Sequence, residues 1–135
     1  MRIRRAKKRD FPRVTALART LSLDYSGMES DEFWVASDGG EVAAICGLKK
    51  HPDCRELISL GVHPACRGRG LGRRLVLALI KETPGDIYLT TVIPAFFEKL
   101  GFQKTSHVPV SVVKEADWCE GCDRALCAAM VRRAE

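Results

Sequence analysis

The stretch "VHPACRGRGLGRRLVLALI" (Val62–Ile80) places three glycines and four arginines directly before an apolar, helix-forming segment. Apolar residues recur at helical spacing from Leu71 to Ile80, which predicts a helix over residues 71–82. The N-terminus of a helix presents unpaired N–H groups and the positive end of the helix dipole, so it attracts anions. Alternating glycines remove the Cβ atoms that would hold a phosphate away from these groups. We therefore expect a phosphate-type anion at this helix start.

The spacing of the loop is Arg67-x-x-Gly70-x-Gly72, which matches neither of the two common nucleotide loops. A Walker loop ends in Gly-Lys-Ser/Thr, and a Rossmann loop reads Gly-x-Gly-x-x-Gly. A tight strand-to-helix turn with solvated arginines is the simpler explanation of the same residues. Glycines that alternate with arginines directly ahead of a helix favour the anion site. The charged residues around it are Arg67, Arg69, Arg73 and Arg74.

Strand and helix patterns alternate along the rest of the chain. Gly39-Gly40 after Asp38 is a strong hairpin signal between two apolar runs. Asp10 is placed to cap a helix with Pro12 in its first turn. The order β-α-β-β-β-α-β-α-β predicts a single α/β domain over residues 1–135, with a sheet of mixed direction. The expected strands are 2–6, 33–37, 41–50, 55–62, 86–92 and 125–131, and the expected helices follow Asp10 and cover 71–82 and 94–100.

The charge is concentrated rather than spread over the chain. The net charge of +5 comes from 22 Lys and Arg against 17 Asp and Glu, and much of the excess lies in residues 2–9 and 67–74. A basic cluster on a glycine loop favours a compact phosphate ligand over nucleic acid. No apolar run approaches the roughly 18 residues that span a bilayer, and no signal peptide opens the chain. We therefore expect a cytoplasmic protein with no nucleic-acid or membrane partner.

Glu56 stands near the start of an expected strand. Side chains alternate along a strand, so its carboxylate shares a face with Ile58, Leu60 and Val62. A carboxylate in apolar surroundings is partly desolvated, a condition that suits a general base. The alternative is a frayed strand start, where Glu56 pairs with Arg55 or a nearby lysine.

Two motifs resemble the GNAT superfamily of N-acetyltransferases. "LGVHPACRGRGLGRRLV" (residues 60–76) is similar to the acetyl-CoA-binding motif Arg/Gln-x-x-Gly-x-Gly/Ala, and "FFEKLGF" (residues 96–102) is similar to the second motif of that family. The resemblance implies a mostly antiparallel central sheet with helices on both faces, and acetyl-CoA as co-substrate. It places the pyrophosphate of coenzyme A at the glycine loop, and the pantetheine arm along the preceding strand. The residues that it assigns to the cofactor are Leu60, Gly61, Val62, Arg67, Gly68, Arg69, Gly70, Leu71, Gly72, Arg73, Phe96 and Phe97.

The same resemblance implies the catalytic roles. Glu56 matches the glutamate that many members use as general base, directly or through a water, and the Leu60 N–H matches the amide that stabilises the thioester oxygen. Many members carry a tyrosine as general acid where this chain has Phe97. A thiolate is a good leaving group and takes a proton from solvent, so the loss does not exclude catalysis. Substitutes for the tyrosine would be Tyr25, Tyr88 or Ser106, and Phe96 and Phe97 either pack against the cofactor or belong to the core.

The stretch "YLTTVIPAFFEKLGF" (residues 88–102) resembles short amino-acid N-acetyltransferases of the N-acetylglutamate synthase type and related arsenic-resistance acetyltransferases. Phenylalanine at this position is usual in that branch, and the likeness implies a free amino acid such as glutamate as acceptor. Arg19, His107 and Lys114 are candidates to bind its carboxylate, although such side chains are more often solvated. The insert over residues 106–117 departs from the branch and leaves the acceptor open.

The six cysteines are many for this length, and without a secretory signal they indicate thiols or metal ligands before disulfides. Cys119, Cys122 and Cys127 have a Cys-x2-Cys-x4-Cys spacing, and a zinc site would need a fourth ligand such as Cys54 or His107. A Cys119–Cys122 redox pair or plain thiols is the simpler explanation. We therefore assign no metal and keep zinc as a second choice.

The sequence predicts acetyl transfer from acetyl-CoA to a primary amine, by a monomer or a homodimer with coenzyme A and a small amine as its partners. Another small amine or a protein N-terminus is an alternative acceptor. From a different class, an acyl-CoA-binding sensor without turnover would explain Phe97. A zinc-stabilised nucleic-acid binder would use the cysteines and the basic excess, but it leaves the glycine loop and Glu56 unexplained.

Overall fold

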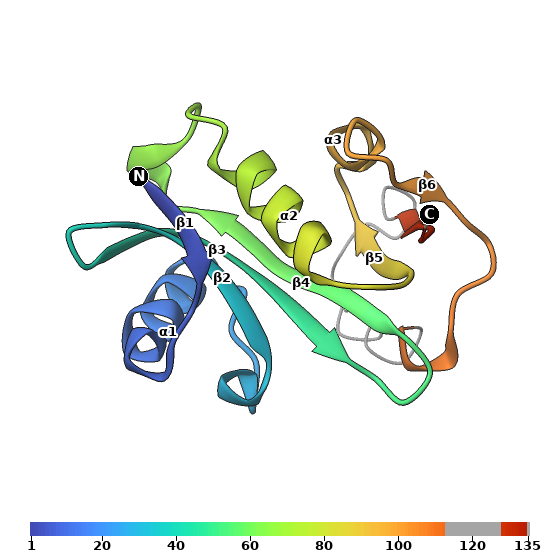
Figure 1. Ribbon diagram of the computed structural model, residues 1–135, viewed down its shortest axis with the longest axis horizontal. Coiled ribbons are helices and arrows are strands. Elements are labelled where there is room, and N and C mark those ends of the chain that lie inside the picture. Colours follow the sequence, from blue (N-terminus) through green and yellow to red (C-terminus); the bar gives the residue numbers. More distant parts are fainter. Residues whose placement is uncertain (113–127, 135) are drawn as a thin grey trace. The chain divides into compact units, whose positions relative to one another are not determined.

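The computed structural model describes residues 1–112 and 128–134 of the 135-residue chain (Figure 1). Contacts divide the chain into two units, residues 1–49 with 57–83 and residues 50–56 with 84–135. The strand β4 (Arg55–Val62) begins in the second unit and continues into the first. No helix among the described residues is long and apolar enough to cross a membrane.

The first unit is built from antiparallel strands and two helices. Its elements are β1 (Arg2–Arg5), α1 (Phe11–Thr20), β2 (Glu32–Asp38), most of β3 (Glu41–Lys50), most of β4 and α2 (Leu71–Glu82). β1 pairs with β2 and β2 with β3, both antiparallel, so that Arg4 lies opposite Val35. The expected hairpin turn is confirmed at Gly39 and Gly40, whose φ angles of +56° and +88° suit glycine.

The helices α1 and α2 cover opposite faces of these strands (Figure 1). Three residues of α1 share one core cluster with Phe33 and Val35 of β2. Trp34 lies between these two residues, so its side chain points to the other face. There its Nε1 donates a hydrogen bond to Glu82 Oε2 of α2 at 2.6 Å. The expectation of helices on both faces is therefore confirmed.

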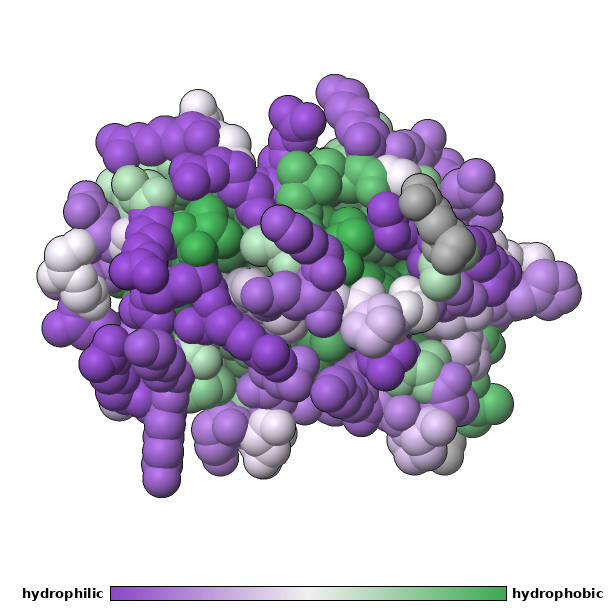
Figure 2. Space-filling model, in the orientation of Figure 1, coloured by the Kyte–Doolittle hydropathy of each residue, from purple (hydrophilic) through white to green (hydrophobic). Residues whose placement is uncertain are grey.

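Hydrophilic side chains gather over the α1 end of the first unit on the face shown in Figure 2. The exposed residues of this end include Arg2, Arg9 and Arg13. The basic excess of the N-terminal segment therefore lies at the surface, where it is available to a ligand.

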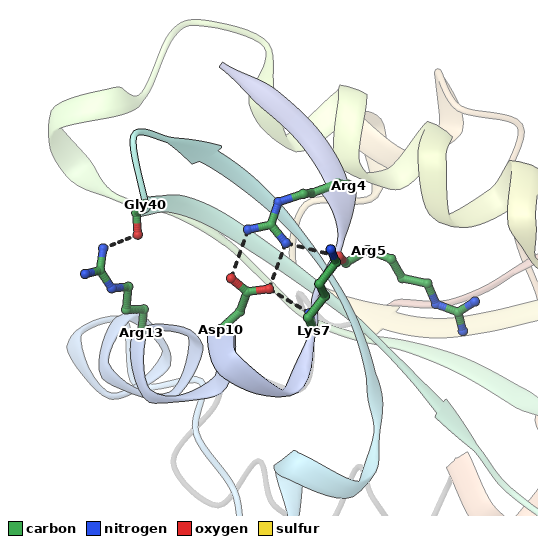
Figure 3. A network of polar contacts seen from close by, with 6 residues as sticks. All are labelled: Arg4, Arg5, Lys7, Asp10, Arg13 and Gly40. Atoms are coloured by element: carbon green, nitrogen blue, oxygen red, sulfur yellow. Dashed lines mark hydrogen bonds and ion pairs between the residues drawn. The ribbon is translucent and has the colours of Figure 1, made fainter.

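Asp10 occupies the predicted N-cap position of α1, but its side chain makes no capping hydrogen bond to the helix. Asp10 precedes the helix, but its carboxylate accepts hydrogen bonds from Arg4 Nη1 and Nη2 at 2.7 and 2.9 Å and from the Lys7 N–H at 2.6 Å (Figure 3). The Arg4 guanidinium is the main cause that holds the pKa of Asp10 far below its usual range. The charged guanidinium of Arg4 donates two hydrogen bonds to this carboxylate, and it is a stronger partner than the neutral N–H groups at the start of the helix. Asp10 therefore ties β1 to the entry of α1.

The second unit contains the remaining strands and a short helix. Its elements are the start of β4, β5 (Ile87–Thr91), α3 (Pro94–Glu98), β6 (Gln103–Lys104) and β7 (Ala128–Arg132). β5 runs parallel to β4, whereas β7 is antiparallel to both β5 and β6. The strand order is β1-β2-β3-β4-β5-β7-β6; β4 and β5 form a parallel pair, and the pairs β1–β2, β2–β3, β5–β7 and β7–β6 are antiparallel. The predicted α/β class with a mostly antiparallel sheet is confirmed.

The element boundaries follow the sequence predictions to within one residue, with three larger differences. β6 is too short, at two residues, to leave a periodic pattern in the sequence. α3 is shorter than the expected helix over 94–100. The described part of the last strand is β7, and residues 125–127 of the expected strand lie outside the described residues.

Candidate active site

The loop before α2 has the backbone conformation that its glycines predict. β4 ends at Val62, a 3-10 turn covers Pro64–Cys66, and α2 begins at Leu71. Gly68 and Gly70 have φ angles of +83° and +72°, a left-handed conformation that other residues rarely adopt. A Cβ atom at either glycine would meet no atom within 4 Å. The glycines are therefore needed for the backbone, and they leave open space over the loop.

The N-terminus of α2 presents unpaired donors. Gly70 precedes the helix and has no side chain, and the first turn contains no acidic residue. The N–H of Arg74 makes the helical bond to the Gly70 carbonyl at 3.1 Å, so the three preceding N–H groups have no partner inside the helix. Arg67, Arg69 and Arg73 are exposed around this helix start. The donor set therefore fits a phosphate-type anion.

The strand β4 pairs with β5 over its first two residues. Arg55 lies opposite Ile87, and Glu56 lies opposite Tyr88. From Leu57 onward, the backbone N–H and C=O groups on that edge of β4 take no part in this ladder. An edge of this kind can hold an extended arm by strand-like hydrogen bonds.

Ser59 interrupts the regular pleat of β4. Its φ angle is +51°, which is uncommon for a residue other than glycine. Its Oγ donates a hydrogen bond to the Leu23 carbonyl at 3.1 Å, and this bond holds the residue in place. Such an irregularity changes the face of the sheet toward which the following side chains point.

The predicted alternation along β4 is therefore wrong. Ile58 lies on the α1 side, 3.0 Å from the position that a Cβ would take on Gly47 of β3. Gly61 faces the same side, because a Cβ there would lie 2.6 Å from leucine side chains that pack against the α1 core. Residues three apart cannot share a face in a regular strand. Glu56 and Leu60 therefore do not share a face by simple alternation.

Glu56 is buried and hydrogen-bonded within the second unit. Its side chain is 6% exposed, and its Oε1 lies 2.8 Å from Nε2 of His51, whose side chain is 7% exposed. A carboxylate can only accept, so His51 carries a proton on Nε2 when Glu56 is ionised. Arg55, a partner that the sequence allowed, donates instead to the Pro84 carbonyl at 2.8 Å. The sequence did not predict His51 as the partner of Glu56. The only sequence feature that could have indicated it is its position in the turn just before the strand that carries Glu56.

The tight turn between β3 and β4 holds His51. Its N–H donates to the Cys54 carbonyl at 2.8 Å. Burial, helped by the carboxylates of Asp53 and Glu56, raises the pKa of the Cys54 thiol to about 12. Cys54 is therefore a neutral thiol at neutral pH, whereas metal ligation uses the thiolate.

The predicted zinc ligands Cys119, Cys122 and Cys127 lie outside the described residues. Within the described residues, no group of three or more His, Cys, Asp and Glu side chains is arranged to hold a metal ion. Cys46 is free and fully buried, and burial raises the pKa of its thiol.

The two phenylalanines of the second motif have different surroundings. Phe97 is 4% exposed and meets the ring of Phe102 edge-on, with centroids 5.6 Å apart. Phe96 is half-buried and packs edge-on against Phe97 at 4.9 Å. Phe97 is therefore a core residue of the second unit, and Phe96 keeps an accessible side.

One predicted carboxylate-binding residue, Arg19, lines a cavity. It is exposed at the end of α1, and the cavity, of about 310 Å³, lies within the first unit. Asp24, Tyr25 and Glu29 are among the other lining residues. The Tyr25 hydroxyl donates to Asp31 Oδ2 at 2.6 Å, so its proton is already engaged.

The remaining candidates are in the second unit or beyond the described residues. His107 and Ser106 are exposed, and the His107 N–H donates to Thr105 Oγ1 at 3.1 Å. The Tyr88 hydroxyl accepts a long hydrogen bond of 3.5 Å from Arg133. Lys114 lies outside the described residues.

A family model matches most of this architecture. Residues 2–102 match the acetyltransferase (GNAT) family. The chain belongs to the GNAT family. The match runs from β1 through α3, and both GNAT motifs of the sequence lie inside it.

Known proteins support the same assignment. The chain is 31% identical over 97 residues to N-acetyltransferase family 8 member 2 of Rattus norvegicus, which covers 61% of this chain and 43% of that protein. It is 27% identical over 132 residues to the amino-acid acetyltransferase of Neisseria meningitidis, which covers 86% of this chain and 30% of that protein. The chain therefore spans less than half the length of these relatives.

A solved structure shows the same fold. N-acetylglutamate synthase from Neisseria gonorrhoeae, complexed with coenzyme A and N-acetyl-glutamate, has a TM-score of 0.79 and 24% identity, over 99% of this chain and 35% of that chain. The predicted GNAT fold and the likeness to the N-acetylglutamate synthase branch are confirmed.

Proposed function

We propose that this GNAT chain transfers an acetyl group from acetyl-CoA to the primary amine of a small molecule, and that the acceptor is a free amino acid such as glutamate. The observation that carries the proposal is the open N-terminus of α2, with its left-handed glycines and exposed arginines. β4 leads into this loop and carries the buried Glu56. The likeness to an amino-acid acetyltransferase supports the class of acceptor.

Coenzyme A suits the donors at the end of β4. N–H groups at a helix start and guanidinium groups both bind phosphate oxygens, so the α2 loop would hold the pyrophosphate. Arg67 Nε donates to the Val62 carbonyl at 3.3 Å, which restrains one arginine of the loop. The open edge of β4 would hold the pantetheine arm through the backbone of Leu60 and Val62. Phe96, with its accessible side, is the aromatic candidate for contact with this arm.

Glu56 would act as the general base, and the Leu60 N–H would stabilise the oxyanion. Glu56 accepts the proton of the acceptor's ammonium group, directly or through a water, because only the neutral amine attacks the thioester. The Leu60 N–H donates to the thioester oxygen as that oxygen gains negative charge. The new N–C bond forms as the C–S bond breaks, and the nitrogen releases its second proton to solvent as the amide forms. Coenzyme A leaves as the thiolate and takes its proton from solvent, because Phe97 has no proton to give.

His51 would act as a positioning residue for this base. Its Nε2 lies 2.8 Å from Glu56 Oε1, and both side chains are buried, so the pair fixes the orientation of the carboxylate. A fixed carboxylate meets the reacting amine without a search over rotamers.

An acyl-CoA sensor without turnover is the second candidate, and the buried Phe97 favours it. General acid help contributes only about 10²–10⁴-fold, and a thiolate leaves readily. Acetyl transfer is therefore the first choice.

Thiol release from acetyl-CoA, measured over a panel of amino acids, tests the proposal. We expect glutamate-like acceptors to release thiol, and Glu56→Gln to lower kcat by about 10²-fold or more at neutral pH while coenzyme A still binds. Glu41→Gln is the matched control, because Glu41 is 85% exposed in its side chain and lies at the hairpin. Equal turnover in Glu56→Gln and Glu41→Gln would sink the base assignment, and tight binding without release for every amine would favour the sensor.

The role of His51 has its own test. We expect His51→Leu to lower kcat by about tenfold with the dissociation constant for coenzyme A unchanged, because a charge-assisted hydrogen bond to Glu56 is lost. His51→Gln, which keeps an N–H donor, should recover part of the loss. If both variants lose kcat equally and unfold at the same lower temperature, His51 is structural only.

A further inference from the structure

A cavity of about 680 Å³ lies beside the β2–β3 hairpin turn in the first unit. Its walls come from the start of β1, the N-terminal end of α1 and the turn itself. The volume lies within the range of small-molecule sites, roughly 300–1,000 Å³. The charged residues that line it are Arg2, Arg4, Arg9, Asp10, Arg13 and Asp38.

Arg4 and Asp10 form a fixed, neutral part of this lining. Both carboxylate oxygens of Asp10 accept from Arg4, and one also accepts from the Lys7 N–H (Figure 3). The two side chains are 21% and 10% exposed, so the pair is largely covered. The hydrogen bonds of Asp10 are taken by Arg4 and Lys7, and Asp10 interacts with Arg9 only through the attraction between their charges, the smallest of the causes that lower its pKa.

The other three arginines carry the excess charge. Arg13 Nη1 donates to the Gly40 carbonyl, which holds the guanidinium at the turn (Figure 3). Its ion pair with Glu41 is long, at 3.6 Å, and highly exposed, so it is weak. Among the described residues, the guanidinium groups of Arg2 and Arg9 have no hydrogen-bonding partner. Three cations therefore line one cavity, where Asp38 is the only unpaired carboxylate among the lining residues.

This cavity and the α2 loop lie on different sides of the strands. Arg2 and Arg4 alternate along β1 with Arg5, which lies over the Trp34 ring at 5.1 Å. Trp34 bonds to Glu82 of α2, so Arg5 faces the α2 side, and the arginines that alternate with it face the α1 side. The two places adjoin at the N-terminus, where Arg74 Nη2 of α2 donates to the carbonyl of the lining residue Met1 at 3.3 Å, but the cavity arginines of β1 face away from α2.

We propose that this cavity binds a small polyanion, a molecule that carries phosphate or carboxylate groups, at a site distinct from that of coenzyme A. A guanidinium group matches the oxygens of either group with two parallel hydrogen bonds. The bound anion offsets the mutual repulsion of the three arginines. It also links β1, α1 and the hairpin turn, so it raises the unfolding temperature.

Calorimetric titration with pyrophosphate and with citrate tests the proposal. Pyrophosphate can also bind at the α2 loop, so we expect the cavity to give one site per chain that Arg69→Gln leaves intact. A double variant Arg2→Gln/Arg9→Gln should weaken binding at that site by about tenfold or more, the loss that follows when charge-assisted hydrogen bonds are removed. Both side chains are exposed and make no hydrogen bond among the described residues, so the variant should unfold close to the wild-type temperature in the absence of anion.

Two control variants locate the site. Lys8→Gln removes an exposed charge from the same segment outside the cavity lining, and Arg69→Gln removes one from the α2 loop. Binding that survives both controls and fails in the double variant supports the cavity. A response to pyrophosphate alone assigns phosphate chemistry, and a response to citrate alone assigns carboxylate chemistry. Failure of both probes to bind, or equal loss in Arg69→Gln, overturns the proposal whether or not the chain transfers acetyl groups.

Discussion

The two long helices of the first unit begin in opposite ways. α1 follows Asp10, whose carboxylate is bound by Arg4 and by the Lys7 N–H, so a charge from the chain itself completes this junction. α2 follows Gly70, with no acidic residue in its first turn and with exposed arginines around it. A helix without a ligand is stabilised by a carboxylate of the chain near its N-terminus. A helix that binds an anionic ligand keeps its N-terminal N–H groups free of such a carboxylate. The difference supports our proposal that α2, rather than α1, is the helix that holds a phosphate.

The largest effect is expected when α2 is given an anion of its own. Gly70→Asp places a carboxylate where the pyrophosphate of coenzyme A would lie, and the repulsion should weaken binding by about 100-fold. Asp tolerates the left-handed backbone better than most residues, so the unfolding temperature should change little. The measurement is the dissociation constant for coenzyme A by calorimetry.

Gly70→Asn is the control for this change. It has nearly the same shape and backbone tolerance without the charge, so it should lose only the part of the affinity that is due to bulk and should bind coenzyme A clearly more tightly than Gly70→Asp. Equal losses in the two variants would show that the glycine is needed for its backbone alone, and the comparison between the two helix starts would fail.

A smaller effect is expected when α1 loses its internal anion. Asp10→Asn keeps the side-chain shape but leaves the part-buried Arg4 without its counter-charge, so the free energy of unfolding should fall by about 2 kcal/mol. Asp24→Asn, at an exposed position between α1 and β2, is the matched control. Chemical denaturation of the three proteins at neutral pH measures the difference, and a stability equal to that of the control would contradict the role of the pair.

The smallest effect is the pH dependence of that difference. The pKa of Asp10 is lower in the folded protein than in the unfolded chain, mainly because of the Arg4 hydrogen bonds. The pair therefore stabilises the fold fully above the unfolded pKa of about 4, and the contribution is lost as the pH falls below it. The gap in stability between wild type and Asp10→Asn should narrow in acid. A gap that is constant across this range would show that Asp10 acts through its shape.

Features set by local backbone chemistry could be predicted from the sequence. The hairpin at Gly39-Gly40, the helix over residues 71–82 and the strand over residues 55–62 all match the structure. In each case the signal is local, because glycine permits positive φ and the apolar spacing matches a single period. The left-handed loop before α2 belongs to this group.

Features set by partners distant in sequence or by single backbone irregularities could not be predicted. The carboxylate of Asp10 is taken by Arg4 of the preceding strand, which a capping rule does not consider. Ser59 adopts positive φ with a hydrogen bond to Leu23, 36 residues away, and so shifts the alternation of β4. His51 meets Glu56 only once the turn between two strands has formed. These three cases need the tertiary structure, and two of them lie in the strand and turn of the candidate active site.

Acetyl transfer to a free amino acid is tested most directly by mass spectrometry of the product formed from isotope-labelled acetyl-CoA and free glutamate. We expect the label on the α-nitrogen of glutamate, one thiol released for each product molecule, and loss of this product in Glu56→Gln. Coenzyme A that binds at the α2 loop while no amine of the panel acquires the label would contradict acetyl transfer.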